Sequence, residues 1–340
     1  MEIIKGTFLL ILVLAFFTLF SYKAPRGMKA MSALASAAIA TFLVEAFQRY
    51  VGGDLLQIEF LGEVGDAAGS MGGVAAAALV ALAMGVSPVY ALMLGASAAG
   101  LGLLPGFIAG YLISFIVKQI ETRVPDGLDL IVAIIVAAPL TRLVAVMADP
   151  VVDATLLNIG GIITETTTAN PIIMGIILGG VITVVATAPL SSMALTAMLG
   201  LTGVPMAIGA LAVFGSSFMN FVFFHRMKFG DRKTTISVAI EPLSQVDIIS
   251  ANPIPVYVTN FLGGATSGII ISLAGLVNGA TGTATPIAGF AVMYGFNDPM
   301  KVTIIALLCA GFSALWGYLG SQIFKNFKIR RVHELAEMNG

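Results

Sequence analysis

The sequence has few charged residues and a single cysteine. Only 10% of its 340 residues are Asp, Glu, Lys or Arg, whereas soluble globular chains carry about 25%. The cysteine, Cys309, lies within an apolar run, so there is no disulfide framework and no multi-cysteine metal site. The formal net charge is −1, and nucleic-acid binding would need a basic patch or stripe. We therefore expect no nucleic-acid partner, metal or resident cofactor.

The motifs of self-contained catalysis are also missing. The sequence has no phosphate-binding Walker loop, no zincin motif and no nucleophile elbow. We therefore expect no catalytic residues, and no ATP-driven transport by this chain alone.

Apolar residues, in contrast, are abundant. They make up 58% of the chain, and the mean hydropathy is +1.00. Several runs approach the ~20 residues that a membrane-spanning helix needs, and they are apolar on every face, unlike the alternating strands of a barrel. These runs include 7–20, 128–140, 172–186 and 302–319. The sequence predicts an all-α polytopic membrane protein with about 8–10 transmembrane helices, re-entrant hairpins and an internal repeat.

Charged residues are distributed unevenly along the chain. Lys and Arg cluster at 23–29, 118–123, 226–233 and 325–331, whereas 54–66 carries only acidic charges. By the positive-inside rule the basic loops are cytoplasmic. We expect residues 1–325 to form one membrane-embedded domain, followed by a short cytoplasmic tail at 326–340 with the C-terminus inside.

Between the second and third basic clusters an even number of crossings is needed. The apolar runs near 128–147, 172–188, 190–203 and 206–224 supply four if all of them cross. Segment 280–294 is too short and too rich in Gly, Thr and Pro to span, so we interpret it as a re-entrant hairpin. Such a hairpin is tolerated only where protein or a water-filled cavity covers it.

Two tetrapeptides suggest the internal repeat. Ala169-Asn170-Pro171-Ile172 recurs at 251–254, and a Leu-Gly-Gly follows each copy. Asn-Pro ends one helix and begins another, and interrupted helices in corresponding halves point to a transporter's binding site. We therefore expect Asn170 and Asn252 to lie close together at a shared cavity. The alternative is a pair of ordinary helix starts at the membrane surface.

Glycines recur with the spacing of closely packed membrane helices. Gly102/Gly106/Gly110, Gly175/Gly179 and Gly264/Gly268 are each separated by three residues. This spacing lets two helix backbones approach closely. Hinges around Pro105 are the alternative for the first set.

One carboxylate stands out at predicted membrane depth. Glu165 lies in a Gly- and Thr-rich stretch at 160–170, between two apolar blocks. An acidic residue inside a membrane is expensive and usually functional, and hydroxyl, amide and carboxylate groups suit the hydroxyls of a sugar. In an external loop, Glu165 would simply be solvated.

Four segments resemble enzyme IIC, the membrane channel of bacterial sugar phosphotransferase systems. Ile163-Thr164-Glu165 resembles the Gly-Ile-Thr-Glu motif that carries the substrate-binding glutamate, but Ile162 replaces its Gly and Thr166 its usual Pro. Segment 105–126 resembles a stretch of the fructose-type channels. Segments 252–264 and 279–286 resemble the stand-alone permease or toxin-regulator branch, and this resemblance covers most of the chain.

The resemblance implies a multi-pass permease of the bacterial inner membrane that is the transport subunit of a phosphotransferase complex. It also implies a sugar substrate, a homodimer and separate cytosolic IIB and IIA carriers, because no fused carrier domain is present. The expected substrate-binding residues are Glu165, Thr164, Asn170, Asn252, Asn260 and His225, although an interfacial role is the alternative for His225. The alternatives for the chain are a membrane-bound sensor or regulator and an ion-coupled secondary transporter that uses Glu165 or Asp149.

Overall fold

A computed structural model of the chain describes residues 2–188, 191–332 and 334. In that part all regular structure is helical, and the only β-pairing is a single bridge between Gly203 and Asn278. Seven described helices are long and apolar enough to cross a membrane, or eight if one bent helix pair counts as a span. The predicted all-α polytopic membrane fold is confirmed, with seven or eight candidate spans among the described residues against the eight to ten predicted.

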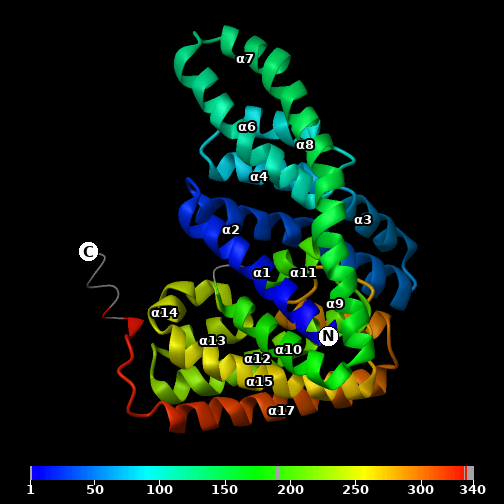
Figure 1. The fold of residues 1–340 in the computed structure, drawn as a ribbon, viewed down its shortest axis with the longest axis vertical. Helices are drawn as coiled ribbons and strands as arrows, with labels where there is room; N and C mark the ends of the chain where they lie inside the picture. The colour runs from blue at the N-terminus through cyan, green and yellow to red at the C-terminus, as the bar shows by residue number, and fades with distance from the viewer. Residues whose placement is uncertain (1, 189–190, 333, 335–340) are drawn as a thin grey trace. The chain divides into compact units, whose positions relative to one another are not determined.

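The chain divides into two compact units (Figure 1). The N-terminal unit comprises residues 9–161 and 197–200, and the C-terminal unit comprises 1–8, 162–196 and 201–340. The first thirteen elements are α1 (Glu2–Lys23), α2 (Gly27–Ala38), η1 (Ile39–Leu43), η2 (Ala46–Leu55), α3 (Glu59–Gly69), α4 (Gly72–Ala83), α5 (Pro88–Ser97), α6 (Leu103–Arg123), α7 (Leu128–Val132), η3 (Ala133–Ala137), α8 (Ala138–Val152), η4 (Asp153–Leu157) and α9 (Asn158–Ala169).

Glycines bring α4 and α6 together in the N-terminal unit. A Cβ on Gly106 would lie 2.7 Å from Cα of Gly73, and one on Gly110 would lie 2.6 Å from Cα of Ala77. No larger side chain fits at either position. The predicted close packing is therefore confirmed for these two glycines, whereas a Cβ on Gly102 would meet only the side chain of Pro105, three residues further along.

The helix that begins at Leu128 is much longer than predicted. Elements α7 to α9 form one continuous helix of 42 residues, Leu128–Ala169, where the sequence predicted a crossing only near 128–147. At 1.5 Å per residue it extends roughly 60 Å, about twice the hydrocarbon thickness of a bilayer. The π-helical turns η3 and η4 lie beside Pro139 and Pro150, where a missing N–H and the proline ring disturb the regular ladder.

The remaining ten elements belong to the C-terminal unit, apart from the last two residues of α11. They are α10 (Pro171–Thr187), α11 (Ser192–Met198), α12 (Gly203–Met227), α13 (Arg232–Ile240), η5 (Pro242–Gln245), α14 (Val246–Ala251), α15 (Pro253–Ala274), α16 (Pro286–Val292), η6 (Met293–Gly295) and α17 (Pro299–Ile323). Figure 1 shows α10, α12, α15 and α17 lying alongside one another.

Helices α12 and α17 run in the same direction, and α15 runs opposite to both. Gly215 of α12 lies against Ser313 of α17, and Gly317, four residues further along α17, lies against Met219 of α12. Both helices therefore end together, which places the basic clusters at 226–233 and 325–331 at one end of the unit. The sequence predicted a common side for these clusters, and its assignment to the cytoplasm remains a prediction.

The described residues of two apolar segments between these helices form no helix long enough to cross a membrane. The predicted span at 190–203 is wrong, because α11 has only seven residues and the chain turns at Gly200 and Gly203, both with positive φ. Segment 275–298 leaves the C-terminal end of α15 and returns at the adjoining start of α17. Its longest helical stretch, Pro286–Gly295, is too short to span, as predicted for a re-entrant hairpin.

Helices α10 and α15 approach each other through the predicted glycine pairs. A Cβ on Gly175 would lie 2.7 Å from the carbonyl oxygen of Gly268, and one on Gly179 would lie 3.0 Å from the carbonyl carbon of Gly264. Pairing Gly175 with Gly268 and Gly179 with Gly264 makes the two helices antiparallel. The predicted close approach of these glycines is confirmed.

Candidate functional site

Two interrupted segments of the C-terminal unit meet inside the protein. The first contains α11 and connects α10 to α12, and the second is the re-entrant segment 275–298. The Ser192 hydroxyl donates to the carbonyl oxygen of Ala284 at 2.6 Å, and the Thr281 hydroxyl donates to that of Thr196 at 3.0 Å. These two hydrogen bonds tie helix α11 to residues 281–284 of the re-entrant segment.

Asn278 organises the re-entrant segment. Its amide nitrogen donates to the Thr283 hydroxyl at 2.9 Å, and its amide oxygen accepts from the backbone N–H of Ala280 at 2.9 Å. Its backbone exchanges two hydrogen bonds with Gly203 at the start of α12, at 2.8 and 3.0 Å. Because Asn278 and Thr283 are both fully buried, the non-helical backbone at this depth is covered by protein, as a membrane interior requires.

Small residues allow the re-entrant segment to pack against α12 about two turns from the start of that helix. Gly209 lies against Ala284, and Gly289 of α16 lies against Ala210. One turn further along, the rings of Phe214 and Phe290 stack with centroids 4.4 Å apart. Hydroxyl and amide groups are thus held in the core of a helical unit, next to an aromatic surface.

A second group of buried polar side chains lies further along α12. Asn260 of α15 donates from its amide nitrogen to the Asn220 amide oxygen and to the carbonyl oxygen of Val256, each at 3.0 Å. The Thr183 hydroxyl of α10 donates to the backbone carbonyl oxygen of Asn260 at 2.9 Å. Both Asn side chains are fully buried, so this group joins three helices.

Three atoms in this region have no hydrogen-bond partner. Among the described residues, the amide nitrogen of Asn220, the amide oxygen of Asn260 and the hydroxyl of Ser217 are buried and unpaired. An unmade hydrogen bond in a buried site is costly, and such groups commonly indicate a functional requirement or an ordered water. These atoms could accept from and donate to the hydroxyls of a sugar.

The structure does not bring the six predicted substrate-binding residues together. Glu165 is exposed and Thr164 half-buried on α9, close to the half-buried Asn170 that precedes α10. Asn260 is buried in the group described above. His225 is exposed on the last turn of α12, where its ring stacks on Phe221, at the far end of that helix from Asn278.

Asn170 and Asn252 both mark helix breaks, as predicted, but they do not approach each other. Each precedes a Pro-initiated helix and adopts nearly the same backbone angles, φ −138° and ψ 67° against φ −131° and ψ 50°. However, α10 and α15 are antiparallel, so their first residues lie at opposite ends of the pair. The prediction that the two Asn-Pro segments share a cavity is therefore wrong.

Asn252 is also engaged in structural contacts. Its amide nitrogen donates to the carbonyl oxygens of Ile248 and Arg330 at 2.8 Å, and its amide oxygen accepts from the backbone N–H of Arg330 at 2.7 Å. With three hydrogen bonds made within the protein, this side chain fastens the C-terminal segment to α14.

Sequence reasoning missed Asn220, Ser192 and Asn278 as candidate site residues. Asn220 could have been noticed because it is an Asn inside an apolar run. Asn278 could have been noticed because it begins the polar stretch that leads to Pro286. No group of three or more His, Cys, Asp or Glu side chains able to hold a metal is present among the described residues.

Comparison with known proteins identifies the family. The chain matches the family described as "Phosphotransferase system, EIIC" over residues 28–336, which includes the two interrupted segments. No curated protein and no solved structure matches the chain. The match covers most of the sequence, and the apolar helices agree with a multi-pass bacterial membrane protein. The chain therefore belongs to the enzyme IIC family, the membrane permease subunits of the sugar phosphotransferase system.

Proposed function

We propose that this chain binds a sugar in the C-terminal unit and releases it inward, where a separate cytosolic carrier protein phosphorylates it. The observation that carries the proposal is the meeting of two interrupted segments around Ser192, Asn278 and Thr283, buried among apolar helices. Transporters place their substrates at such breaks, because backbone and side-chain polar groups are freed there from helical hydrogen bonding.

The chemistry of the buried groups suits an uncharged, hydroxyl-rich substrate. The site offers hydroxyls and carboxamides, which both donate and accept, and no charged side chain belongs to either buried group described above. A charged substrate would need a counter-ion at this depth. A sugar needs only reciprocal hydrogen bonds and an aromatic or apolar face, which Phe214 and Phe290 supply.

We also propose that Glu165, together with Thr164, contacts the sugar from outside these two buried groups. Its carboxylate is exposed on α9, directly before the Asn170 break, and could accept from sugar hydroxyls. Hydrogen bonds to a charged group contribute about 1.5–3 kcal/mol, so Glu165→Gln should weaken sugar binding by roughly tenfold or more. Glu63→Gln is the matched control, because it removes an exposed carboxylate from α3 and should leave sugar affinity unchanged.

Uptake experiments test the proposal directly. Labelled sugars are screened in cells that express the chain, and accumulation is measured in membrane vesicles with and without phosphoenolpyruvate and the soluble carrier proteins. We expect uptake only when both are supplied, and the product should be a sugar phosphate. Uptake driven by a proton gradient without phosphorylation would contradict the proposal, and so would sugar binding with no uptake under any condition.

A further inference from the structure

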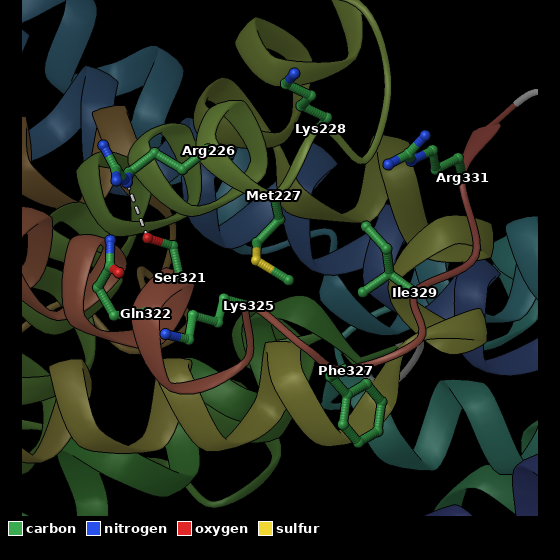
Figure 2. A pocket seen from close by; sticks show the side chains of 9 residues that line it. All are labelled: Arg226, Met227, Lys228, Ser321, Gln322, Lys325, Phe327, Ile329 and Arg331. Carbon is green, nitrogen blue, oxygen red and sulfur yellow. Dashed lines mark hydrogen bonds between the residues drawn. The ribbon is translucent and has the colours of Figure 1, made fainter.

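A basic pocket lies at the end of the C-terminal unit where α12 and α17 terminate. It has a volume of about 340 Å³ and is lined by Arg226, Met227, Lys228, Ser321, Gln322, Lys325, Phe327, Ile329 and Arg331. In the view of Figure 2, Arg226, Gln322 and Lys325 lie to the left of Met227, Arg331 lies to its right and Lys228 lies above it. Four cationic residues, Arg226, Lys228, Lys325 and Arg331, therefore line one pocket.

The walls of the pocket are fixed by hydrogen bonds. Arg226 donates from Nε to the Ser321 hydroxyl at 2.9 Å, and its guanidinium lies over the Tyr318 ring, 4.5 Å from the centroid. The segment after α17 is fastened through the three hydrogen bonds of Asn252, two of them to the backbone of Arg330, and by a bond from Val332 N–H to the Phe229 carbonyl at 3.0 Å. The cations on this segment are thus held at the pocket.

All charged residues that line the pocket are basic, and the carboxylate of Glu334 beside it accepts from the backbone N–H of Arg331 at 3.1 Å. No Asp or Glu lines it, and none of its four cations forms an ion pair with another described residue. The adjoining pocket shares Lys228 and Arg331 and includes one carboxylate, Asp231. That carboxylate already accepts from the backbone N–H and the hydroxyl of Thr234, at 2.8 and 2.9 Å. Four like charges around one space, two of them guanidinium groups, favour a phosphate ligand.

The surface beside the pocket identifies the source of that phosphate. The last turns of α17 expose large apolar side chains, with 50% of Leu315 and 61% of Ile323 accessible, and Phe327 at the pocket is 42% accessible. A free phosphate would make no use of an apolar strip. A phospholipid would use both features, because its acyl chains could lie along α17 while its headgroup enters the pocket.

We propose that this pocket binds the phosphate headgroup of an anionic membrane phospholipid. Basic pockets at the ends of transmembrane helices recognise such headgroups, and each Lys or Arg near an anionic surface adds measurably to the attraction. The site lies outside the two buried polar groups assigned to the sugar, so it gives the chain a second ligand. Asn252 acts in it as a positioning residue, because it holds the segment that carries Lys325 and Arg331.

The test compares two double variants with equal charge changes. Lys325→Gln/Arg331→Gln removes two pocket cations, and Lys328→Gln/Arg330→Gln removes two cations of the same segment whose side chains do not line the pocket. Binding of dioleoylphosphatidylglycerol to the purified protein is measured by native mass spectrometry, with dioleoylphosphatidylcholine as the zwitterionic probe and inorganic phosphate as competitor. We expect the pocket variant to bind phosphatidylglycerol about 30-fold more weakly, and the control variant to stay close to wild type.

Further measurements distinguish a phospholipid from the other possible ligands of the pocket. Asn252→Ala removes no charge but should weaken phosphatidylglycerol binding, and unchanged melting temperatures without lipid would exclude a general loss of fold. Equal losses in both double variants would overturn the proposal in favour of diffuse surface charge. Displacement of the lipid by low concentrations of inorganic phosphate would assign the site to free phosphate. Binding of an acidic cytosolic carrier protein that is lost only in the pocket variant, with lipid binding unaffected, would assign it to a protein interface.

Discussion

The antiparallel contact between α10 and α15 can be tested by adding one methyl group. In Gly268→Ala the new Cβ would lie 2.7 Å from the carbonyl carbon of Gly175 and 3.2 Å from Cα of Gly179. Both neighbours are backbone atoms, so no side chain can rotate away. The carbonyl oxygen of Gly175 lies closer still, and ordinary contact begins at 3.4 Å, so the two helices would have to separate by more than 0.7 Å.

The expected change in the free energy of unfolding is the balance of two opposing effects, the loss of packing and the gain in helix propensity. Overpacking of this kind costs about 1–3 kcal/mol. The same separation would stretch the 2.9 Å bond between the Thr183 hydroxyl and the carbonyl of Asn260 beyond hydrogen-bonding distance. Replacing Gly by Ala within a helix returns roughly 0.5–1 kcal/mol through helix propensity. We expect Gly268→Ala to lose about 1–2 kcal/mol of unfolding free energy in total.

Gly311→Ala is the matched control. Gly311 lies within α17, and a Cβ there would meet no heavy atom within 4 Å. This variant gains the same helix propensity without a clash, so it should be as stable as wild type or more stable. The difference between the two variants isolates the cost of the helix contact.

The chain contains its own reporter for this experiment. Trp316 is the only tryptophan, and its indole N–H donates to the Thr266 hydroxyl of α15 at 2.8 Å. Its fluorescence, followed during unfolding by SDS, reports the separation of α15 from α17. If Gly268→Ala unfolds at the same SDS fraction as Gly311→Ala, or at a higher one, the glycine-mediated contact is refuted.

Three further predictions concern other parts of the C-terminal unit. Asn260→Leu should lower the free energy of unfolding by about 1–3 kcal/mol, because it removes the donor to the buried amide oxygen of Asn220. A double-mutant cycle with Asn220→Leu should give a measurable coupling energy, and strict additivity would contradict the pairing. Hydrogen bonds from the backbone and hydroxyl of Thr234 lower the pKa of Asp231, so this carboxylate stabilises the protein above the pKa of about 4 of an unfolded Asp, and the contribution is lost as pH falls through the lower folded value. The difference in melting temperature between wild type and Asp231→Asn should therefore shrink between pH 7 and pH 3, and a constant difference would argue against it. Lys228→Cys should resist an impermeant thiol reagent added outside intact cells, and strong external labelling would reverse the predicted orientation.

Local patterns in the sequence predicted much of the fold. Runs of apolar residues predicted helices because a bilayer leaves backbone groups no other partner. Asn170-Pro171 and Asn252-Pro253 predicted helix breaks because proline constrains the residue before it and cannot donate a backbone hydrogen bond. The glycine spacing on α10 and α15 predicted close packing. In each case the cause lies within a few residues, so it can be read without knowing the fold.

Predictions from the sequence failed where the outcome depended on how several segments pack against one another. The run at 190–203 is apolar enough to cross, but turns at Gly200 and Gly203 and its contacts with the re-entrant segment make it a short interior helix. Hydropathy reports the solvent that a segment prefers, and a protein interior and a lipid bilayer are alike in that respect. Length and hydrophobicity therefore could not separate the two outcomes.

By itself, the sequence determined that the chain is a helical membrane protein, where Asn-Pro interrupts its helices and which glycines permit close contact, because these properties depend on local sterics and on transfer from water. Only the tertiary structure decided that α10 and α15 run in opposite directions, which places Asn170 and Asn252 apart and pairs Asn260 with Asn220 instead. It also decided that the segments around Ser192 and Asn278 meet, because helix direction and the choice of neighbours depend on contacts between residues distant in the chain.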